Sequence, residues 1–321
     1  MIRAPLARSF LSRTPLALVF AAAALALAAL AQLAAGRAPA DATSGRRSAP
    51  AGAAARAAAH SPLAATGQLG GIARAVAIDG ERAYLGVGAR LRVYGGCDDP
   101  LAHLLGETDV LPGVVEDVAV GPAGDVAWLA LGAAGVWAVD VGNPSRPFDV
   151  GRDAVPADVD GVPVEAHRIA VDRTGRRWVA TNVGLVVVGR GAVTHMRAPE
   201  ASLAPEPVHD IAFSGAYALV AWGAHGLRVL HADAFDAVRP VGHLALANAQ
   251  AVAAAPGGRA WVADGPVLRS VDVGDPTAPA AVGELAISAT GGDGRALALR
   301  GTTVLVAFAR APAAVAALAA V

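Results

Sequence analysis

Six polar residues recur along the chain at the same place in a repeated pattern, each at the start of a short aliphatic strand. The spacings between them are 42, 51, 42, 41 and 45 residues. We call this set the polar column, and it consists of Arg74, Glu116, His167, His209, Gln250 and Arg295. A position that stays polar while its chemistry changes, and that is always followed by aliphatic residues, is hard to explain by packing alone. The column is therefore the best candidate for a binding site.

Three members of the column could do chemistry together. Glu116, His167 and His209 come from successive copies of the pattern. Two imidazoles and a carboxylate can hold Zn²⁺ or a similar ion with an open position for water, which is hydrolase or lyase chemistry. Without metal, the same groups could act as general acid and base, because histidine titrates near neutral pH. A structural or binding role is the third interpretation.

Each column residue opens a unit of short strands separated by glycine, aspartate and proline. The second strands begin at Ala83, Ala127, Arg177, Ala218, Ala260 and Thr303. Apolar runs of this length between turn residues indicate strands and disfavour helices. Four strands in about 40 to 50 residues match the blade of a β-propeller. We therefore expect an all-β, six-bladed β-propeller of four-stranded blades over residues 62–321.

The third strand and the turn after it carry a distinct motif. It is GVWAVDVGNPSRP over Gly135–Pro147 and PVLRSVDVGDPTAP over Pro266–Pro279. This motif resembles the LVIVD repeat, whose units are similar to β-propeller blades. The resemblance is good in the second and fifth copies, partial in the first, third and fourth, and nearly gone in the sixth. It implies a bacterial or archaeal cell-surface setting and no known common reaction.

The two ends of the repeat region predict how the ring closes. The sixth copy stops after its third strand, Ala313–Val321. The segment Pro62–Leu69 precedes the first copy and resembles the fourth strands of the other copies. We expect this N-terminal strand to complete the last blade, because closure removes the exposed edges of an open sheet.

The resemblance to propellers also places the polar column. In such proteins the first strand of each blade lines the central channel and begins at the face where ligands usually bind. The turns between second and third strands should reach the same face, and they supply Asn182, Trp222, His225 and Asp264. Aromatic and imidazole groups at a channel mouth could hold a small ligand, while polar groups there could instead line a water-filled funnel.

The longest spacing in the column comes from an insertion between the second and third blades, Gly151–Glu165. Asp153, Asp158 and Asp160 make this segment acidic. Its DVDG sequence offers fewer oxygen ligands than a calcium loop needs. We therefore expect a solvated loop on the candidate face.

The N-terminal part of the chain differs from the repeats. Three arginines precede an unbroken apolar run, Leu16–Ala31, and Ala38–Ala40 offers a small-residue cleavage pattern. Residues 1–40 are therefore typical of a secretory signal peptide, with an uncleaved membrane anchor as the alternative. Residues 41–61 are rich in Ala, Arg, Ser, Gly and Pro and are expected to form a disordered linker. We predict an exported protein.

The net charge and the cysteine content exclude one class of partner and one kind of covalent link. Removal of residues 1–40 leaves 22 basic and 27 acidic residues, a formal charge of −5. A nucleic-acid partner is therefore not expected, because a basic surface is its first requirement. Cys97 is the single cysteine, so the exported domain has no internal disulfide.

Two functions follow from the sequence. The first is a secreted or membrane-tethered binding or scaffold module that holds a protein or small-molecule ligand at the channel mouth. The alternative is an extracytoplasmic hydrolase or lyase that uses Glu116, His167 and His209 as metal ligands or acid–base groups. The chain has no GxSxG, HExxH, CxxC or phosphate-loop motif, which favours the first. The sequence leaves the cofactor unknown, and a membrane would be contacted only through the N-terminal segment if this segment stays uncleaved.

Overall fold

The computed structural model describes residues 73–96, 103–189, 192–197, 206–232, 238–287, 292–301, 303–309 and 314–320. The predicted signal peptide, linker and closing strand, as well as Cys97, lie outside these residues. Every regular element in the described part of the chain is a β-strand, which confirms the all-β prediction. Within the same part, no helix is long and apolar enough to span a membrane.

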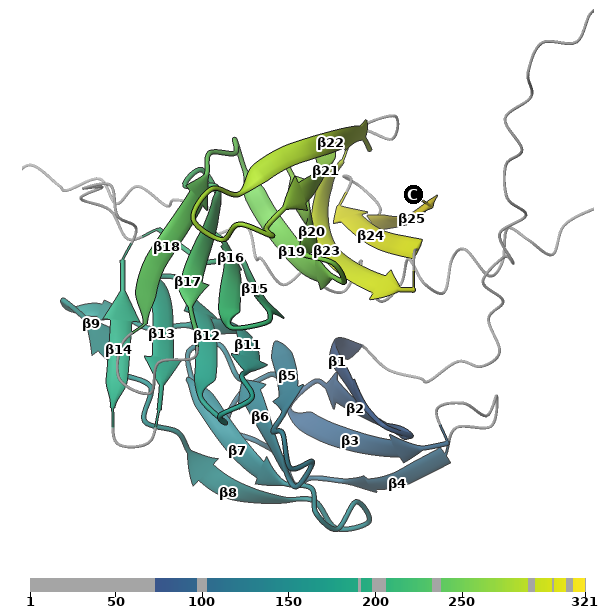
Figure 1. The fold of residues 1–321 in the computed structure, drawn as a ribbon. Helices are drawn as coiled ribbons and strands as arrows, with labels where there is room; N and C mark the ends of the chain where they lie inside the picture. Colours follow the sequence, from purple (N-terminus) through teal and green to yellow (C-terminus); the bar gives the residue numbers. More distant parts are fainter. Residues whose placement is uncertain are drawn as a thin grey trace, which may run out of the picture.

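Six antiparallel sheets of three or four strands follow one another in the described part of the chain, and each has its strands in simple sequential order (Figure 1). The first sheet contains β1 (Ala73–Asp79), β2 (Arg82–Val87), β3 (Arg90–Gly95) and β4 (His103–Glu107). The second contains β5 (Asp117–Val120), β6 (Val126–Ala130), β7 (Val136–Asp140) and β8 (Phe148–Arg152). The third contains β11 (Ala166–Val171), β12 (Arg177–Thr181), β13 (Gly184–Val188) and β14 (Val193–Met196).

The remaining sheets repeat this order. The fourth contains β15 (Asp210–Ser214), β16 (Tyr217–Ala221), β17 (Leu227–His231) and β18 (Arg239–Leu244). The fifth contains β19 (Ala249–Ala255), β20 (Arg259–Asp264), β21 (Val267–Asp272) and β22 (Ala280–Ala286). The sixth has three strands, β23 (Asp293–Arg300), β24 (Thr303–Ala309) and β25 (Ala314–Ala320).

The sheets are arranged around a common axis. The first strands of neighbouring sheets pack against one another in chain order, from β1 through β5, β11, β15 and β19 to β23. Figure 1 shows these first strands on the inside of the arrangement and the fourth strands on the outside. Among the described residues β25 pairs only with β24, so these residues do not test the predicted closing strand.

Backbone hydrogen bonds join successive sheets where the first strands begin. The glycine turn after a second strand bonds to the chain at the start of the next sheet. The pairs are Gly88 with Val115, Gly132 with Ala166, Gly223 with Ala249, and Gly265 with Gly294. These four turn glycines have φ between 52° and 58°, a conformation that other residues rarely adopt. The turns and the starts of the first strands therefore lie at one face, which we call the ring face.

The hydrophobic core lies between the sheets. Trp178 of the third sheet packs with Ile211 and Val220 of the fourth. Leu219 of the fourth sheet packs with Val252 of the fifth. Because each sheet buries its apolar face against a neighbour, the repeats depend on stacking for stability.

The acidic insertion is only partly the solvated loop that we expected. It forms the hairpin of β9 (Asp158–Val159) and β10 (Val162–Pro163), and Asp158 and Asp160 are exposed. Asp153, however, is 7% exposed and accepts two 2.8 Å hydrogen bonds from Arg177 of β12. The expectation was therefore wrong for Asp153, because its carboxylate pairs across two sheets.

Candidate functional site

β-Bulges set the local geometry of the polar column. In four sheets the ladder between the first and second strands is interrupted at a single residue. That residue is the column member in each case, namely Arg74, His167, Gln250 and Arg295. A bulge leaves its extra residue unpaired and re-aims the side chain, and bulges are common beside functional sites. Glu116 and His209 lie directly before β5 and β15.

Column side chains from neighbouring sheets contact each other in two pairs. Arg74 Nη1 donates to Glu116 Oε1 at 2.6 Å, which joins the first and second sheets. Arg295 Nη1 donates to Gln250 Oε1 at 2.6 Å, which joins the sixth and fifth sheets. The first pair is a salt bridge, whereas the second joins a cation to a neutral amide.

The two histidines lie between these pairs. Burial lowers the pKa of both imidazoles, and for His209 burial and the charge of Arg295 together lower the pKa to about 4. For His167, the carboxylates of Glu165, 3.9 Å away, and Glu116 oppose the effect of burial on the pKa. Both histidines are therefore neutral at pH 7.

A second layer of charged residues lies one position further along the first strands. Asp117 Oδ2 accepts a 2.9 Å hydrogen bond from the backbone N–H of Ile169 in the next sheet. Asp210 Oδ2 accepts the equivalent 2.9 Å bond from Val252. Each carboxylate thus ties its own first strand to the first strand of the following sheet.

Arg168 occupies the same position between these two carboxylates. Its Nη1 lies 3.7 Å from Asp117 Oδ1. Burial raises the pKa of Asp117 and raises that of Asp210 to about 6, while the charge of Arg168 opposes both shifts. We did not single out this layer from the sequence. The available signal was the Asp directly after Glu116 and His209.

The candidates from the turns have mainly structural contacts. Trp222 is 1% exposed, packs between the third and fourth sheets, and donates from Nε1 to Glu206 O at 3.3 Å. Asp264 is 4% exposed. The backbone N–H of His225 donates within its own turn, to Trp222 O at 2.8 Å. Neither Trp222 nor Asp264 presents its side chain at the mouth, so we leave both out of the ligand contacts proposed below.

Asn182 holds the acidic insertion in place. Its Nδ2 donates to Pro163 O at 2.9 Å, and its Oδ1 accepts from the backbone N–H of Glu165 at 2.8 Å. This amide therefore fixes the chain that leads to His167.

The metal hypothesis finds no supporting geometry. Across the described ranges, no three side chains of His, Cys, Asp or Glu are placed so that they could hold a metal ion. Glu116, His167 and His209 are neighbours that influence each other's charge, but they do not form a chelating group.

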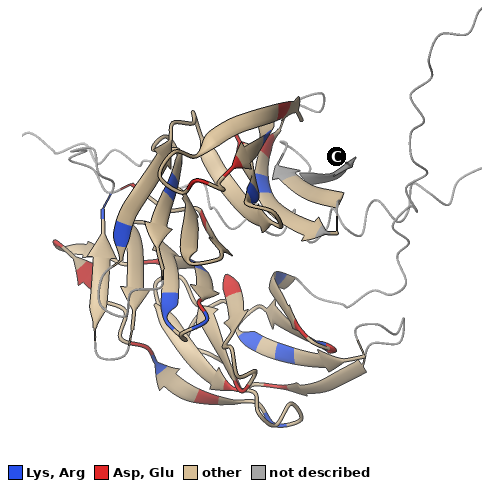
Figure 2. Ribbon diagram, in the orientation of Figure 1, with Lys and Arg blue, Asp and Glu red and all other residues tan. Residues whose placement is uncertain are grey.

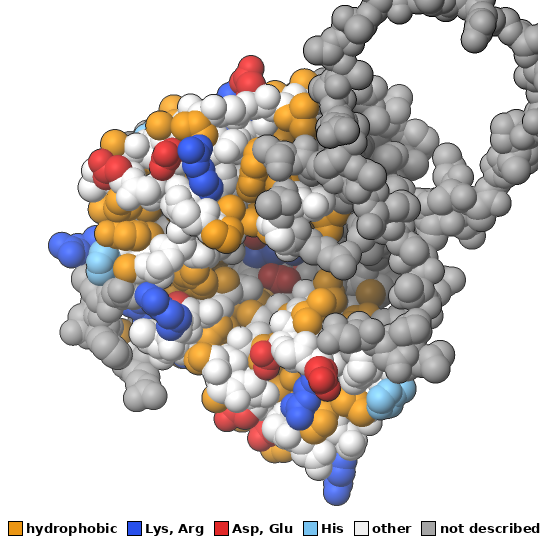
Figure 3. Space-filling model, turned by 45° about the vertical axis from the view of Figure 1, so that its right-hand side comes forward, with side chains coloured by type: hydrophobic (Ala, Val, Ile, Leu, Met, Phe, Trp, Pro, Cys, Tyr) orange, Lys and Arg blue, Asp and Glu red, His pale blue; other side chains and the backbone are white. Residues whose placement is uncertain are grey.

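The charges of the site lie inside the arrangement of sheets. Figure 2 shows acidic residues at the start of β5 near a basic residue at the start of β1. In Figure 3, which turns the molecule by 45°, acidic and basic side chains are visible in a hollow between the sheets.

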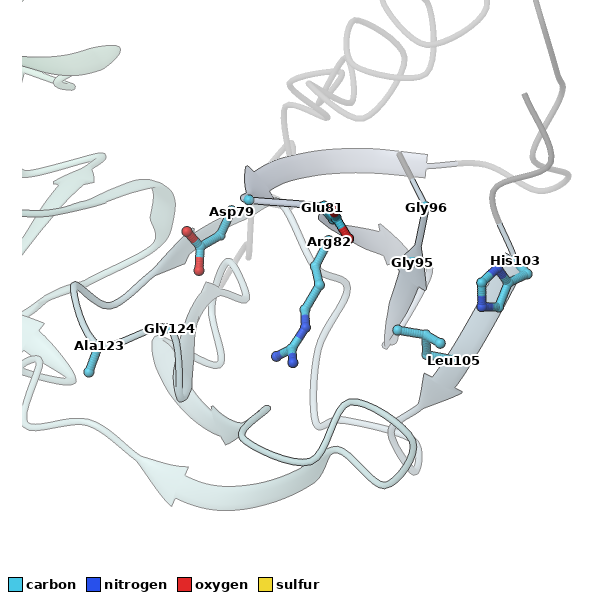
Figure 4. Close-up of a pocket in the computed structure, with 10 residues that line it drawn as sticks. Asp79, Glu81, Arg82, Gly95, Gly96, His103, Leu105, Ala123 and Gly124 are labelled. Atoms are coloured by element: carbon cyan, nitrogen blue, oxygen red, sulfur yellow. The ribbon is translucent and has the colours of Figure 1, made fainter. Parts of the chain in front are cut away.

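A separate cavity of about 590 Å³ lies away from the ring face. Its lining includes the turn between β1 and β2, and no member of the polar column (Figure 4). Asp79, Arg82 and His103 are among its residues, with Gly124 from the second sheet. This cavity offers a control location for variants of the ring face.

The stacked four-stranded sheets and the inward polar column define the class of protein as a β-propeller. More particularly, residues 112–152, which contain the whole second sheet, match the model of the LVIVD repeat. This match confirms the resemblance found in the motif of Gly135–Pro147.

Solved structures show the same class. The chain is similar to the β-propeller domain of Cps50 (Swd1) from Myceliophteria thermophila, with 13% identity, a TM-score of 0.60, and 78% of this chain and 84% of that chain covered. It is similar to a chain of the mitotic checkpoint complex, with 12% identity, a TM-score of 0.60, and 78% and 74% covered. It is also similar to Chaetomium thermophilum Sqt1 bound to the N-terminus of ribosomal protein L10, with 15% identity, a TM-score of 0.56, and 74% and 70% covered. These identities establish the fold alone. No curated protein matches the chain in sequence.

Proposed function

We propose that the protein is a secreted or membrane-tethered β-propeller that binds a small-molecule ligand or a protein at the channel mouth formed by the polar column. The supporting observation is that column side chains from different sheets contact one another beside bulges. Burying charged groups costs free energy that their pairing offsets only in part, and the hydrophobic contacts between sheets do not require these groups. A recognition role accounts for their presence.

The solved structures supply a precedent for the kind of function. Sqt1 was crystallised with the N-terminus of a ribosomal protein, and another similar chain belongs to a multiprotein complex. A propeller that serves as a binding module is therefore a known use of this fold in those proteins.

Ring closure is the second part of the proposal. The third residue of the repeated first-strand pattern is apolar, and in Val118, Ile169, Ile211 and Val252 it is 4% to 9% exposed. The corresponding residue of β1, Val76, is 64% exposed. The other four pack against the preceding sheet, as Val252 does against Leu219. We propose that the sixth sheet, completed by residues 62–69, covers Val76 and makes a six-bladed ring.

Charge substitution at Val76 tests closure. Val110, which is 69% exposed in a loop, provides the matched control. If the ring closes, Val76→Asp buries an unpaired carboxylate and lowers the free energy of unfolding by about 3 kcal/mol or more. Val110→Asp should change it by less than about 0.5 kcal/mol. Equal and small effects in chemical denaturation would contradict closure.

A thermal-shift screen tests the binding function. The panel contains carboxylic acids, sugars, amino acids, amines and nucleotides. We expect at least one class to raise the melting temperature, because ligand binding to the native state stabilises it. The shift should disappear in the His167→Ala/His209→Ala double variant and persist in Arg82→Ala, which alters the separate cavity. A shift that survives the double variant would place binding elsewhere.

Export is the remaining part of the proposal. It rests on the basic and apolar pattern of residues 1–40. N-terminal sequencing of the protein from the extracytoplasmic fraction should give a start near Asp41 if the segment is cleaved, or Met1 if it stays as an anchor. Recovery of the protein in the cytoplasm alone would refute export.

A further inference from the structure

Arg295 differs from the other arginines of the channel in its hydrogen-bond partner. Its Nη1 donates to the amide oxygen of Gln250 at 2.6 Å. The nearby carboxylate of Asp293 is 3.9 Å from Nη2, beyond hydrogen-bond distance. Within the described residues, Nε of Arg295 has no hydrogen-bond partner. The side chain is 37% exposed, so its charge is only partly compensated and is open to solvent on one side.

A chain of hydrogen bonds fixes the amide that holds Arg295. Gln250 Nε2 donates to Asn248 Oδ1 at 2.6 Å, which leaves Gln250 Oε1 directed to the guanidinium. Asp264 Oδ1 accepts from the backbone N–H of Asn248 at 2.7 Å, and Asp264 Oδ2 accepts from Arg269 Nε at 2.8 Å. The support is thus preorganised, as binding groups require, and it orients the cation without neutralising it.

The opposite half of the channel mouth is built differently. Arg74 is paired with Glu116, and Arg168 lies 3.7 Å from Asp117. Each of these arginines therefore has a carboxylate from a neighbouring sheet, whereas the carboxylate nearest to Arg295, that of Asp293, lies on the same strand. Since the fold supplies carboxylates where an arginine ties sheets together, the amide partner of Arg295 is a distinctive feature.

The surroundings of His209 point to the same location. Besides burial, the charges that lower its pKa to about 4 are those of Arg295, His167 when protonated, and Arg168. No carboxylate is among these causes. The imidazole is thus in a region of positive potential, where an anion would be stabilised.

We propose that this half of the channel mouth binds the carboxylate group of a small ligand, with Arg295 as the charged contact and His209 beside it. A guanidinium matches the planar geometry of a carboxylate and forms strong charge-assisted hydrogen bonds with it. A single partly compensated cation suits a monoanion, while the acidic groups of Glu116 and Asp117 disfavour a phosphate dianion. This inference rests on the proposed binding function and specifies its ligand class.

Lactate, with its neutral isostere lactamide, is the first probe. We expect lactate to shift the His209 NMR signals and to raise the imidazole pKa, because a bound anion offsets the charge of Arg295. Lactamide should leave both unchanged. Free acids and peptide C-termini share this chemistry, so N-acetyl-Ala-Ala and its C-terminal amide form a second pair of probes. Tighter binding of the peptide acid than of lactate would indicate a peptide end as the source.

Variants of Arg295 complete the test. Arg295→Gln should weaken lactate binding at least about tenfold, the value of one charged hydrogen bond. Arg295→Lys keeps the charge and should bind lactate more weakly than the unaltered protein but more tightly than Arg295→Gln. If Arg295 has only a structural role, the two variants should bind lactate alike. Arg82→Gln, in the separate cavity, should bind as the unaltered protein does. Thermal unfolding of each variant checks that it is folded.

Two results would overturn the inference. One is no change at His209 at about 50 mM lactate, a concentration that detects a Kd of ~10 mM. The other is lactate binding that Arg295→Gln leaves unaltered. A neutral or cationic compound that binds the ring face through His167 and His209 would also overturn it, while leaving the proposed binding function in place.

Discussion

His167 and His209 occupy the same position on neighbouring sheets, yet their surroundings differ. Burial lowers the pKa of both imidazoles. His167 has Glu165 and Glu116 nearby, which raise its pKa, whereas the charges that act on His209 are all positive. The same position of the repeat therefore has carboxylates beside it in the third sheet, at His167. In the fourth sheet, at His209, the neighbouring charges are positive.

In this fold the charge at a column position depends on the partner side chain as well as on the position. Bulges place four column residues in equivalent geometry. The partner then decides the charge, since Arg74 is neutralised by Glu116 while Gln250 leaves Arg295 positive. The proposed ligand recognition would thus use the same column of residues as structural pairing.

Among variants that compare the two halves of the ring face, the largest expected effect comes from removing the carboxylate that supports Gln250 and Arg295. Asp264→Ala removes a 4% exposed carboxylate that accepts from Asn248 and Arg269. The loss should lower the free energy of unfolding by about 2 to 4 kcal/mol, because both donors lose a partner. Glu284→Ala, which removes the 68% exposed partner of the same Arg269, should cost less than about 1 kcal/mol. If both variants lose the same free energy of unfolding in denaturant, Asp264 contributes no more to stability than the exposed Glu284, and the prediction is wrong.

Exchanging the partners between the two halves should have a smaller effect on stability. Glu116→Gln breaks a partly buried ion pair and should cost about 1 to 2 kcal/mol. Gln250→Glu gives Arg295 a carboxylate and should change stability by less than about 1 kcal/mol.

Lactate binding and the pKa of His209 can be measured in the same Gln250→Glu variant. In Gln250→Glu we expect lactate binding to be lost and the pKa of His209 to rise. Persistence of lactate binding in this variant would show that the charge of Arg295 is not the recognised feature.

The net pH dependence of stability between pH 4 and 6 should be the smallest effect, because two opposite pKa shifts of similar size act in the same window. His209 has a pKa of about 4 in the folded protein, below its ordinary value of 6.5. Because the unfolded chain takes up this proton more readily, His209 lowers the free energy of unfolding as pH falls from 6.5 to 4. Asp210 has a folded pKa of about 6, above its ordinary 3.8, so it removes stability as pH rises through that window.

Two variants separate these opposing contributions. Relative to the unaltered protein, His209→Asn should gain stability as pH falls from 6.5 to 4, and Asp210→Asn should gain stability as pH rises from 4 to 6. Urea unfolding at several pH values measures both differences. Slopes of the same sign would mean that one of the two groups is not buried as described.

Much of the architecture could be predicted from the sequence. The repeated apolar runs and glycine turns indicated stacked β-sheets, because strands of this length must pair and pack to bury their apolar side chains. The polar column was visible because Arg74 and its equivalents each stand at the start of an aliphatic strand.

The contacts were harder to predict than the positions. Alternation along β5 and β15 did not reveal that Asp117 and Asp210 accept hydrogen bonds from the backbone of the next sheet, because this contact depends on how neighbouring sheets pack. Trp222 was expected at the mouth because its turn reaches that face, but its ring fills the space between two sheets. Such choices depend on tertiary packing, which residue spacing does not encode.

The pKa of His209, measured by NMR in the ligand-free protein and in Arg295→Gln, tests the account most directly. We predict a value of about 4 in the unaltered protein, from burial and the charge of Arg295. The value should rise in the variant, while that of His167 should change little, because Arg295 is not among the charges that act on it. A pKa near 6.5 that Arg295→Gln leaves unchanged would contradict the claim that positive charge dominates around His209 at the ring face.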